Sequence, residues 1–164
     1  IDASNYKLNE NLKITSHDQE ILLQSEDIEK FSSKNFRIVS KRKPTSKQLK
    51  DLIFAFNMCR YVKSNAIVIA SDQATVGIGS GQPSRLDSCQ LAINKMKKFD
   101  LITENLVAAS DAFFPFVDGI EKLVQSGVRS IIQPSGSIRD KDIINFANKT
   151  DTVLVFSKTR HFKH

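Results

Sequence analysis

The sequence contains few of the residues that build metal centres and disulfide frameworks. Its 164 residues include two cysteines and three histidines, and neither a CxxC nor an HxxxH spacing occurs. A zinc site or a disulfide scaffold therefore has no support, and Cys59 and Cys89 are expected to be reduced, core-packed thiols of a cytoplasmic protein. No apolar run approaches the ~18 residues of a transmembrane span, and no signal segment opens the chain, so no membrane partner is expected.

The positive charge is spread along the chain. The 24 lysines and arginines exceed the 18 acidic residues and give a net charge of +6, but only residues 41–43 and 95–98 form basic clusters. Without a basic stripe interleaved with aromatic residues we expect no nucleic-acid partner; small phosphorylated or carboxylated ligands suit this balance better. A hydrophobic content of 40% is ordinary for one soluble domain. Because Ile1 is not a start methionine, we expect a fragment of a longer protein.

Short apolar runs alternate with amphipathic stretches along most of the chain. Strands are predicted over residues 36–40, 66–70, 75–79, 105–110, 128–132 and 152–156. Helices are predicted over residues 45–59, with a capping box at its start, 84–99, 118–126 and 140–148. This alternation predicts a three-layer α/β/α fold with a mostly parallel or mixed sheet, the largely parallel arrangement being the natural one. Residues 35–164 are expected to form this domain. Residues 1–34 are polar and predict a linker or edge segment with short extended pieces.

Two loops at the ends of predicted strands have unusual compositions. Residues 77–81 hold three glycines before Arg85, but their spacing does not match a dinucleotide-binding loop. These glycines indicate either a tight turn with positive φ or a backbone pressed against a ligand beside Arg85. Residues 110–118 hold three phenylalanines between aspartates, which suits a clamp for a fused heteroaromatic ring. Alternatively, Asp118 caps its helix and the phenylalanines close the core.

The remaining candidate positions lie nearer the end of the chain. Residues 133–140 could hold a polar ligand at a helix N-terminus, or Ser137 is an ordinary N-cap with Asp140 three positions on. Arg160 offers a rigid guanidinium suited to phosphate, whereas His161 and His164 are expected to be surface histidines. Asp111, at a predicted strand end, is a turn carboxylate or the ligand of a monovalent cation such as potassium.

Taken together, these loops resemble a known family. The segments VKSNAIV (62–68), GIGSGQ (77–82) with Ser84 and Arg85, SDAFFPF (110–116), IIQPSGSIRD (131–140) and RHFKH (160–164) occur in order. They are similar to the C-terminal portion of the AICAR transformylase/IMP cyclohydrolase family of purine biosynthesis, from about residue 36 to residue 164. The resemblance implies formyl transfer from 10-formyltetrahydrofolate to the amino group of AICAR. It also implies a cytidine-deaminase-like subdomain without zinc, in a homodimer whose active sites lie at the interface.

The resemblance assigns roles to individual residues. It places Asn65 against the AICAR carboxamide and reacting amine, Arg85 also on AICAR, and Arg160 on its phosphate. His164 would help to order the site from the terminus. The residues implied to line the folate pocket are Leu86, Phe113, Phe116, Asp118, Ser137 and Ile138. Pro83 and Val117 depart from the family pattern; neither removes a proposed contact, but Val117 removes a cation beside Asp118.

The resemblance covers only one part of the family's catalytic apparatus. The Lys-His pair taken as the family's proton-transfer residues belongs to a subdomain that is missing here, and Lys163-His164 belongs instead to the terminal motif. We therefore expect a chain that binds substrates and is inactive alone. The alternative is a stand-alone, non-catalytic nucleotide- or folate-binding module. A zinc deaminase of the same fold fails because Cys59 and Cys89 cannot supply its metal ligands.

Overall fold

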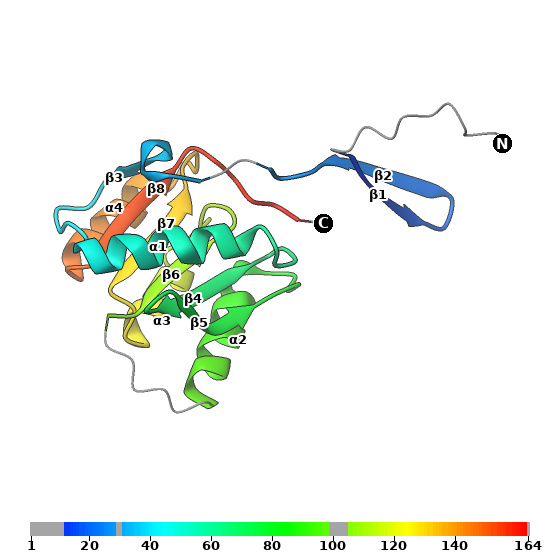
Figure 1. Cartoon of the computed structure of the whole chain (residues 1–164). Helices are drawn as coiled ribbons and strands as arrows, with labels where there is room; N and C mark the ends of the chain where they lie inside the picture. The colour runs from blue at the N-terminus through cyan, green and yellow to red at the C-terminus, as the bar shows by residue number, and fades with distance from the viewer. Residues whose placement is uncertain (1–11, 29–30, 99–104, 164) are drawn as a thin grey trace.

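The computed structural model describes residues 12–28, 31–98 and 105–163. Within these ranges a six-stranded sheet lies between helices (Figure 1). Its strands, in order across the sheet, are β3 (Phe36–Ile38), β8 (Val153–Ser157), β7 (Ser130–Pro134), β6 (Val107–Ser110), β4 (Ile67–Ser71) and β5 (Ala74–Gly79). The helix α1 (Ser46–Cys59) covers one face, and the helices on the other face are α2 (Arg85–Lys98), α3 (Asp118–Gln125) and α4 (Asp140–Lys149). The three-layer α/β/α prediction is confirmed.

The alternation of side chains along β4 explains how the sheet joins two cores. Ile67 and Ile69 are fully buried in the cluster on the side of α2, α3 and α4. Val68 and Ala70 are fully buried in the cluster on the side of α1. Successive side chains of a strand point to opposite faces, so a strand that is apolar throughout needs a layer on each side. The prediction that residues 66–70 are covered on both faces is confirmed.

The sheet is mixed, which confirms the mixed arrangement that the sequence allowed rather than the largely parallel one. Only β6, β7 and β8 run parallel to one another, whereas β4 is antiparallel to both β5 and β6, and β3 is antiparallel to β8. The connection from β4 to β5 consists of Asp72 and Gln73, with φ of 52° and 56°, and a two-residue turn of this kind joins only antiparallel strands. Asp51 on α1 accepts hydrogen bonds from both backbone N–H groups, at 3.2 and 2.8 Å, and thereby supports a turn that lacks glycine.

The helices α3 and α4 begin at the predicted residues, but the expected capping residue is present only in α1. The capping box of α1 is present: Thr45 Oγ1 accepts from the Gln48 N–H at 3.2 Å, and Gln48 Oε1 accepts from the Thr45 N–H at 3.0 Å. Asp118 is the first residue of α3 rather than its cap, and its carboxylate accepts the N–H of Gly119 at 2.7 Å. Ser137 likewise precedes α4 by a turn, because residues 138 and 139 form that turn before the helix begins at Asp140.

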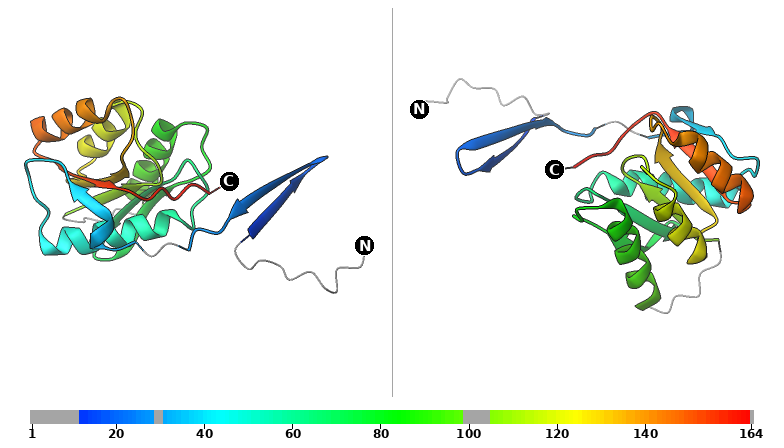
Figure 2. Two further views of the ribbon diagram at one scale, coloured as in Figure 1. Left: turned by 90° about the horizontal axis from the view of Figure 1, so that it is seen from above. Right: turned by 180° about the vertical axis from the view of Figure 1, so that it is seen from behind.

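A β-hairpin projects from the α/β body as an N-terminal arm. Its strands, β1 (Leu12–His17) and β2 (Glu20–Ser25), pair with each other and form a sheet of their own. The arm extends away from the body in each view (Figures 1 and 2). Beyond it, the buried Phe31 packs on Phe56 of α1, with ring centroids 4.5 Å apart. The extended pieces expected near the N-terminus are therefore a hairpin, and Phe31 anchors the following segment on the body.

Candidate functional site

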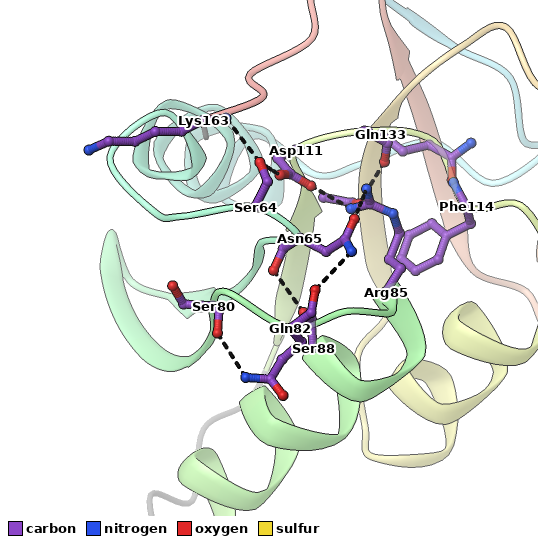
Figure 3. Close-up of polar contacts among 12 residues, drawn as sticks. Ser64, Asn65, Ser80, Gln82, Arg85, Ser88, Asp111, Phe114, Gln133 and Lys163 are labelled. Atoms are coloured by element: carbon purple, nitrogen blue, oxygen red, sulfur yellow. Dashed lines mark hydrogen bonds and ion pairs between the residues drawn. The ribbon is translucent and has the colours of Figure 1, made fainter. Parts of the chain in front are cut away.

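The loops singled out in the sequence meet at one edge of the sheet. The parallel strands β6, β7 and β8 end at this edge, and ligands of open α/β sheets bind outside such carboxyl ends. Because β4 runs antiparallel to β6 and β5 antiparallel to β4, the start of β4 and the end of β5 lie there too. Figure 3 shows residues from these segments turned toward one another.

Arg85 and Asp111 form a buried ion pair at the centre of this edge. The Arg85 side chain is 7% exposed and the Asp111 side chain 0%, and Nη1 of Arg85 donates to Oδ1 of Asp111. The same nitrogen donates to Ser110 Oγ at 2.8 Å, and Nη2 donates to Asn65 Oδ1 at 2.9 Å. The second oxygen of Asp111 accepts from Ser64 Oγ at 2.5 Å. The pair thus links α2, β6 and the segment before β4 (Figure 3).

The carboxamide of Asn65 is held in one orientation. Its Nδ2 donates to the backbone oxygens of Gln82, at 2.9 Å, and Pro83, at 3.3 Å. Its backbone oxygen accepts from Ser88 Oγ at 2.7 Å. An amide oxygen has two lone pairs and a guanidinium five N–H donors. After the contacts to Arg85, one lone pair of Asn65 Oδ1 and part of the Arg85 guanidinium are left for a ligand.

A pocket of about 400 Å³ adjoins these two side chains. Its walls come from the segments before β4, at the start of α2, after β6 and after β8. The lining residues are Asn65, Pro83, Ser84, Arg85, Ala112, Phe113, Pro115, Arg160 and Phe162. The exposed Arg160 guanidinium lies over the Phe162 ring, 4.3 Å from its centroid. The structure therefore brings together Asn65, Arg85, Arg160 and Phe113, which the sequence singled out separately.

The other predicted folate residues lie outside this pocket, on the neighbouring surface. Phe116 is 55% exposed, and the Arg139 guanidinium lies 5.4 Å from its ring centroid. Ile138 is fully exposed, Asp118 is exposed, and Leu86 and Ser137 are partly buried. Arg139 was not singled out in the sequence, and only its contact with Phe116 draws attention to it.

His161 is the residue at this edge that sequence reasoning misjudged. It was expected at the surface, but its side chain is 0% exposed, with the ring centroid 4.5 Å from that of Phe56. Its Nδ1 contacts the Asp27 carboxylate, and its backbone N–H donates to Asp111 O at 3.1 Å. The segment after β8 leads from a buried strand to α1, where the imidazole packs on the ring of Phe56. His164 lies outside the described residues.

The same segment pairs with the residue before Asn65. The Lys163 N–H donates to Ser64 Oγ at 2.9 Å, and the Ser64 N–H donates to Lys163 O at 3.0 Å. Ser64 therefore contacts both Asp111 and the terminal segment. Nothing in its sequence neighbourhood marks Ser64, because a lone serine in a polar loop has many ordinary roles.

Two glycines of the glycine-rich loop have a role that the sequence did not suggest. A Cβ atom at Gly77 would lie 2.3 Å from the backbone oxygen of Ala92, and one at Gly79 would lie 1.9 Å from that of Ser88. Both glycines therefore let β5 pack directly against the backbone of α2. Gly81, with φ of 66°, is the tight turn. Gly77 and Gly79 therefore place α2, and with it Arg85, whereas contact of this loop with a ligand stays a prediction.

Both cysteines are buried and free. Burial raises the pKa of the Cys59 thiol well above its ordinary value, and the Asp111 carboxylate raises it further. Burial also raises the pKa of the Cys89 thiol to about 12, against a smaller opposite effect of the Arg85 guanidinium. Thiols that stay protonated are poor nucleophiles and poor metal ligands. The described part of the chain contains no group of three or more histidine, cysteine, aspartate or glutamate side chains arranged for a metal ion. None of its helices is long and apolar enough to cross a membrane.

Comparison with known proteins confirms the resemblance. The family model of the AICARFT/IMPCHase bienzyme matches residues 1–95. The bifunctional purine biosynthesis protein PurH of Persephonella marina is 46% identical over 144 residues, and that of Buchnera aphidicola subsp. Schizaphis graminum is 47% identical over 145. Each match covers 88% of this chain and 28% of the relative, so the chain spans less than a third of the length of these relatives.

Among solved structures, the crystal structure of a diaminohydroxyphosphoribosylaminopyrimidine deaminase/5-amino-6-(5-phosphoribosylamino)uracil reductase from Thermotoga maritima is similar with a TM-score of 0.41. The two sequences are 11% identical, and the match covers 66% of this chain and 34% of that one.

Proposed function

Because the chain belongs to the AICARFT/IMPCHase bienzyme family, we propose that it is the C-terminal part of a phosphoribosylaminoimidazolecarboxamide formyltransferase. The reaction converts 10-formyltetrahydrofolate and AICAR into formyl-AICAR and tetrahydrofolate, in a bifunctional protein that also has IMP cyclohydrolase activity. The observation that carries this proposal is the shared pocket of Asn65, Arg85 and Arg160. An amide, a buried guanidinium and an exposed guanidinium suit the carboxamide, base and phosphate of one nucleotide.

The orientation of Asn65 supports a role in positioning the reacting amine. Its nitrogen is tied to the backbone of residues 82 and 83, so the free lone pair of Oδ1 has a set direction. An oxygen acceptor held in this way can receive an N–H of the AICAR amine or carboxamide and orient the amine toward the formyl group. Arg160 contributes a planar cation at the solvent side of the pocket, where a phosphate can be held by paired N–H groups.

The aromatic residues beside the pocket support binding of the folate cosubstrate. Phe113 lines the pocket, and the exposed ring of Phe116 offers a second flat apolar surface. Asp118 remains exposed, so that its carboxylate can accept N–H groups from a pterin-like ring. Leu86, Ser137 and Ile138 complete the proposed folate surface. The exposure of Phe116, Asp118 and Ile138 fits a surface that another subunit or subdomain covers, as in a homodimer with interfacial active sites.

The chain does not supply every group that the reaction needs. Attack by a weakly nucleophilic aryl amine calls for a positioned proton acceptor, worth about 10²–10⁴-fold in rate. In our proposal the acceptor is a Lys-His pair of an upstream subdomain, and His164 has at most a supporting role. Residues 1–34 would link that subdomain to the domain of residues 35–164. In our proposal the enzyme acts in the cytoplasm. Potassium near Asp111 stays a prediction: Ser64 and Arg85 each donate to one oxygen of its carboxylate, and no step of the proposed reaction passes through a cation.

Calorimetric titration of the chain with AICAR nucleotide and with a folate analogue tests the assignment. Asn65→Ala and Arg160→Ala are expected to weaken nucleotide binding about tenfold or more, as for the loss of a hydrogen bond to a charged group. Asp118→Ala should weaken binding of the folate analogue. Asn94→Ala and Arg129→Ala are matched controls at exposed positions outside the pocket. Unchanged binding in all three site variants would overturn the site assignment.

A further inference from the structure

The N-terminal arm contacts the segment that follows β8. Gln24 on β2 donates from Nε2 to the backbone oxygen of Phe162 at 2.7 Å. Asp27, just beyond β2, pairs with His161, and its side chain is 29% exposed. In both views of Figure 2 the terminal segment runs toward the base of the arm. Two side chains from the start of the chain therefore hold residues 161 and 162, near its end.

His161 fixes this segment from several directions. Its imidazole is fully buried between the Asp27 carboxylate and the Phe56 ring. Phe56 in turn packs against Phe31, the anchor of the segment that follows the arm. The backbone N–H of His161 donates to Asp111, the partner of Arg85. The position of the terminal segment is thus shared between the arm, α1 and the ion pair of the site.

Neighbouring residues of this segment face different pockets. Arg160 and Phe162 line the nucleotide pocket, which is the pocket of about 400 Å³ that Asn65 and Arg85 also line. His161, together with Phe162 and Lys163, lines a second pocket of about 640 Å³ between the segment and the arm. In an extended segment successive side chains point to opposite sides, so a side chain held on one side sets the direction of its neighbour on the other. Fixing His161 therefore fixes the backbone from which the Arg160 side chain extends toward the other pocket.

We propose that Asp27 and Gln24 are positioning residues for the nucleotide pocket. They hold the terminal segment, through His161 and the backbone of Phe162, so that Arg160 meets the phosphate of the ligand. This inference rests on the proposed function, because it assigns the phosphate to Arg160. A displacement of about 1 Å at a binding group is enough to lose much of its contribution, so support of this kind from outside the pocket has a measurable effect.

Two measurements on Asp27→Ala test the proposal. The first is amide hydrogen exchange, which should become about tenfold faster at His161 and Lys163 and stay unchanged in β6 and β7, since one charge-assisted contact is lost. The second is the affinity for AICAR nucleotide relative to its nucleoside, which lacks the phosphate. This ratio should fall about tenfold while nucleoside affinity stays constant. A merely structural role would weaken both ligands together.

Glu26→Ala is the matched control, because Glu26 is an exposed carboxylate of the same pocket wall, adjacent to Asp27. It should change neither exchange nor the affinity ratio. Gln24→Ala provides a second variant if Asp27→Ala folds poorly. It should change the same amide exchange rates and the same affinity ratio in the same direction, by a smaller factor. Unchanged exchange at both amides, or equal losses for nucleotide and nucleoside, would overturn the proposal. If the unaltered chain binds neither compound, the proposed function fails, while the exchange data still decide whether the arm fixes the segment.

Discussion

Contacts from several segments converge on Asp111. Its carboxylate accepts from Arg85 and Ser64, its backbone oxygen accepts from His161, and its N–H donates to Ala66 O. A fully buried carboxylate is tolerated only when charge and hydrogen bonds are both satisfied. Asp111 therefore acts on the pocket indirectly, by holding the guanidinium that orients Asn65.

Replacing Asp111 by asparagine tests this position. Asp111→Asn leaves the Arg85 guanidinium buried without its counter-charge, so the free energy of unfolding should fall by about 3 kcal/mol or more. Asp142→Asn is the control, because it breaks the exposed Arg139–Asp142 pair and should cost no more than about 0.5 kcal/mol. Urea unfolding of both variants gives the comparison. Equal, small losses would contradict a stabilising role for the buried pair.

The raised pKa of Cys89 gives a pH dependence with a definite sign. Above its ordinary pKa the thiol ionises in the unfolded chain, whereas the folded chain keeps the proton until about pH 12. The free energy of unfolding is therefore at its full value below about pH 9. It declines between about pH 9 and 12, by at most about 1.4 kcal/mol per pH unit. Unfolding measured at several pH values in this range should show a steeper loss for the unaltered chain than for Cys89→Ala. Parallel curves would contradict the shift.

At the scale of elements, the sequence pattern located most helices and strands but not their directions. Short apolar runs marked the segments 66–70 and 128–132 as strands, but such a run carries no information on the direction of the strand. The direction of β5 depends on the turn at Asp72 and Gln73, whose positive φ values rest on hydrogen bonds from Asp51, 21 and 22 residues away. A long-range contact of this kind leaves no local signal. The arm was predicted as extended pieces without a partner strand.

The glycines of β5 place α2, and Gly79→Ala should show this. The added Cβ meets the backbone of Ser88, so α2 has to move, which costs about 1–3 kcal/mol as for other overpacked contacts. Since Arg85 opens α2, nucleotide affinity should fall as well. Thermal unfolding and calorimetry measure the two effects.

Gly81→Ala is the control for this substitution. Gly81 has φ of 66°, and an added Cβ would meet only Cδ of Lys63, at 3.9 Å, so alanine adds about 1–2 kcal/mol of backbone strain without pushing on α2. Both variants should lose stability, but only Gly79→Ala should move α2. A Gly79→Ala chain with unaltered nucleotide affinity would show that the packing of β5 against α2 does not set the position of Arg85.

At the scale of the whole molecule, the sequence singled out the loops that form the pocket, but it did not reveal the contacts between their residues. The sequence singled out Asn65, Arg85, Arg160 and Phe113, and the fold brings them to one pocket. It did not reveal that Arg85 pairs with Asp111, because two charges in separate loops have many alternative partners. His161 was misjudged for a related reason: its burial depends on Asp27 and Phe56, which are more than a hundred residues away in the sequence.

The chain alone should give no detectable formyl transfer. It carries proposed binding residues, while the proton acceptor of the reaction is assigned to an upstream subdomain, and the absence of an acceptor costs about 10²–10⁴-fold. Formation of tetrahydrofolate from 10-formyltetrahydrofolate and AICAR, followed by absorbance, measures this directly. Calorimetric binding of AICAR nucleotide in the same sample confirms that the protein is folded. Robust turnover by the purified chain would contradict the assignment of the acceptor.

The pairing of residues 161–163 with Ser64 and Asp111 also has a consequence for synthesis on the ribosome. Domains begin to fold while translation proceeds, and contacts between distant residues form only after both partners have emerged. All six strands of the sheet are complete at Ser157, whereas Arg160, His161 and Lys163 follow it. The strands therefore leave the ribosome before residues 160–163, and the pocket, which needs Arg160 and Phe162, is completed last.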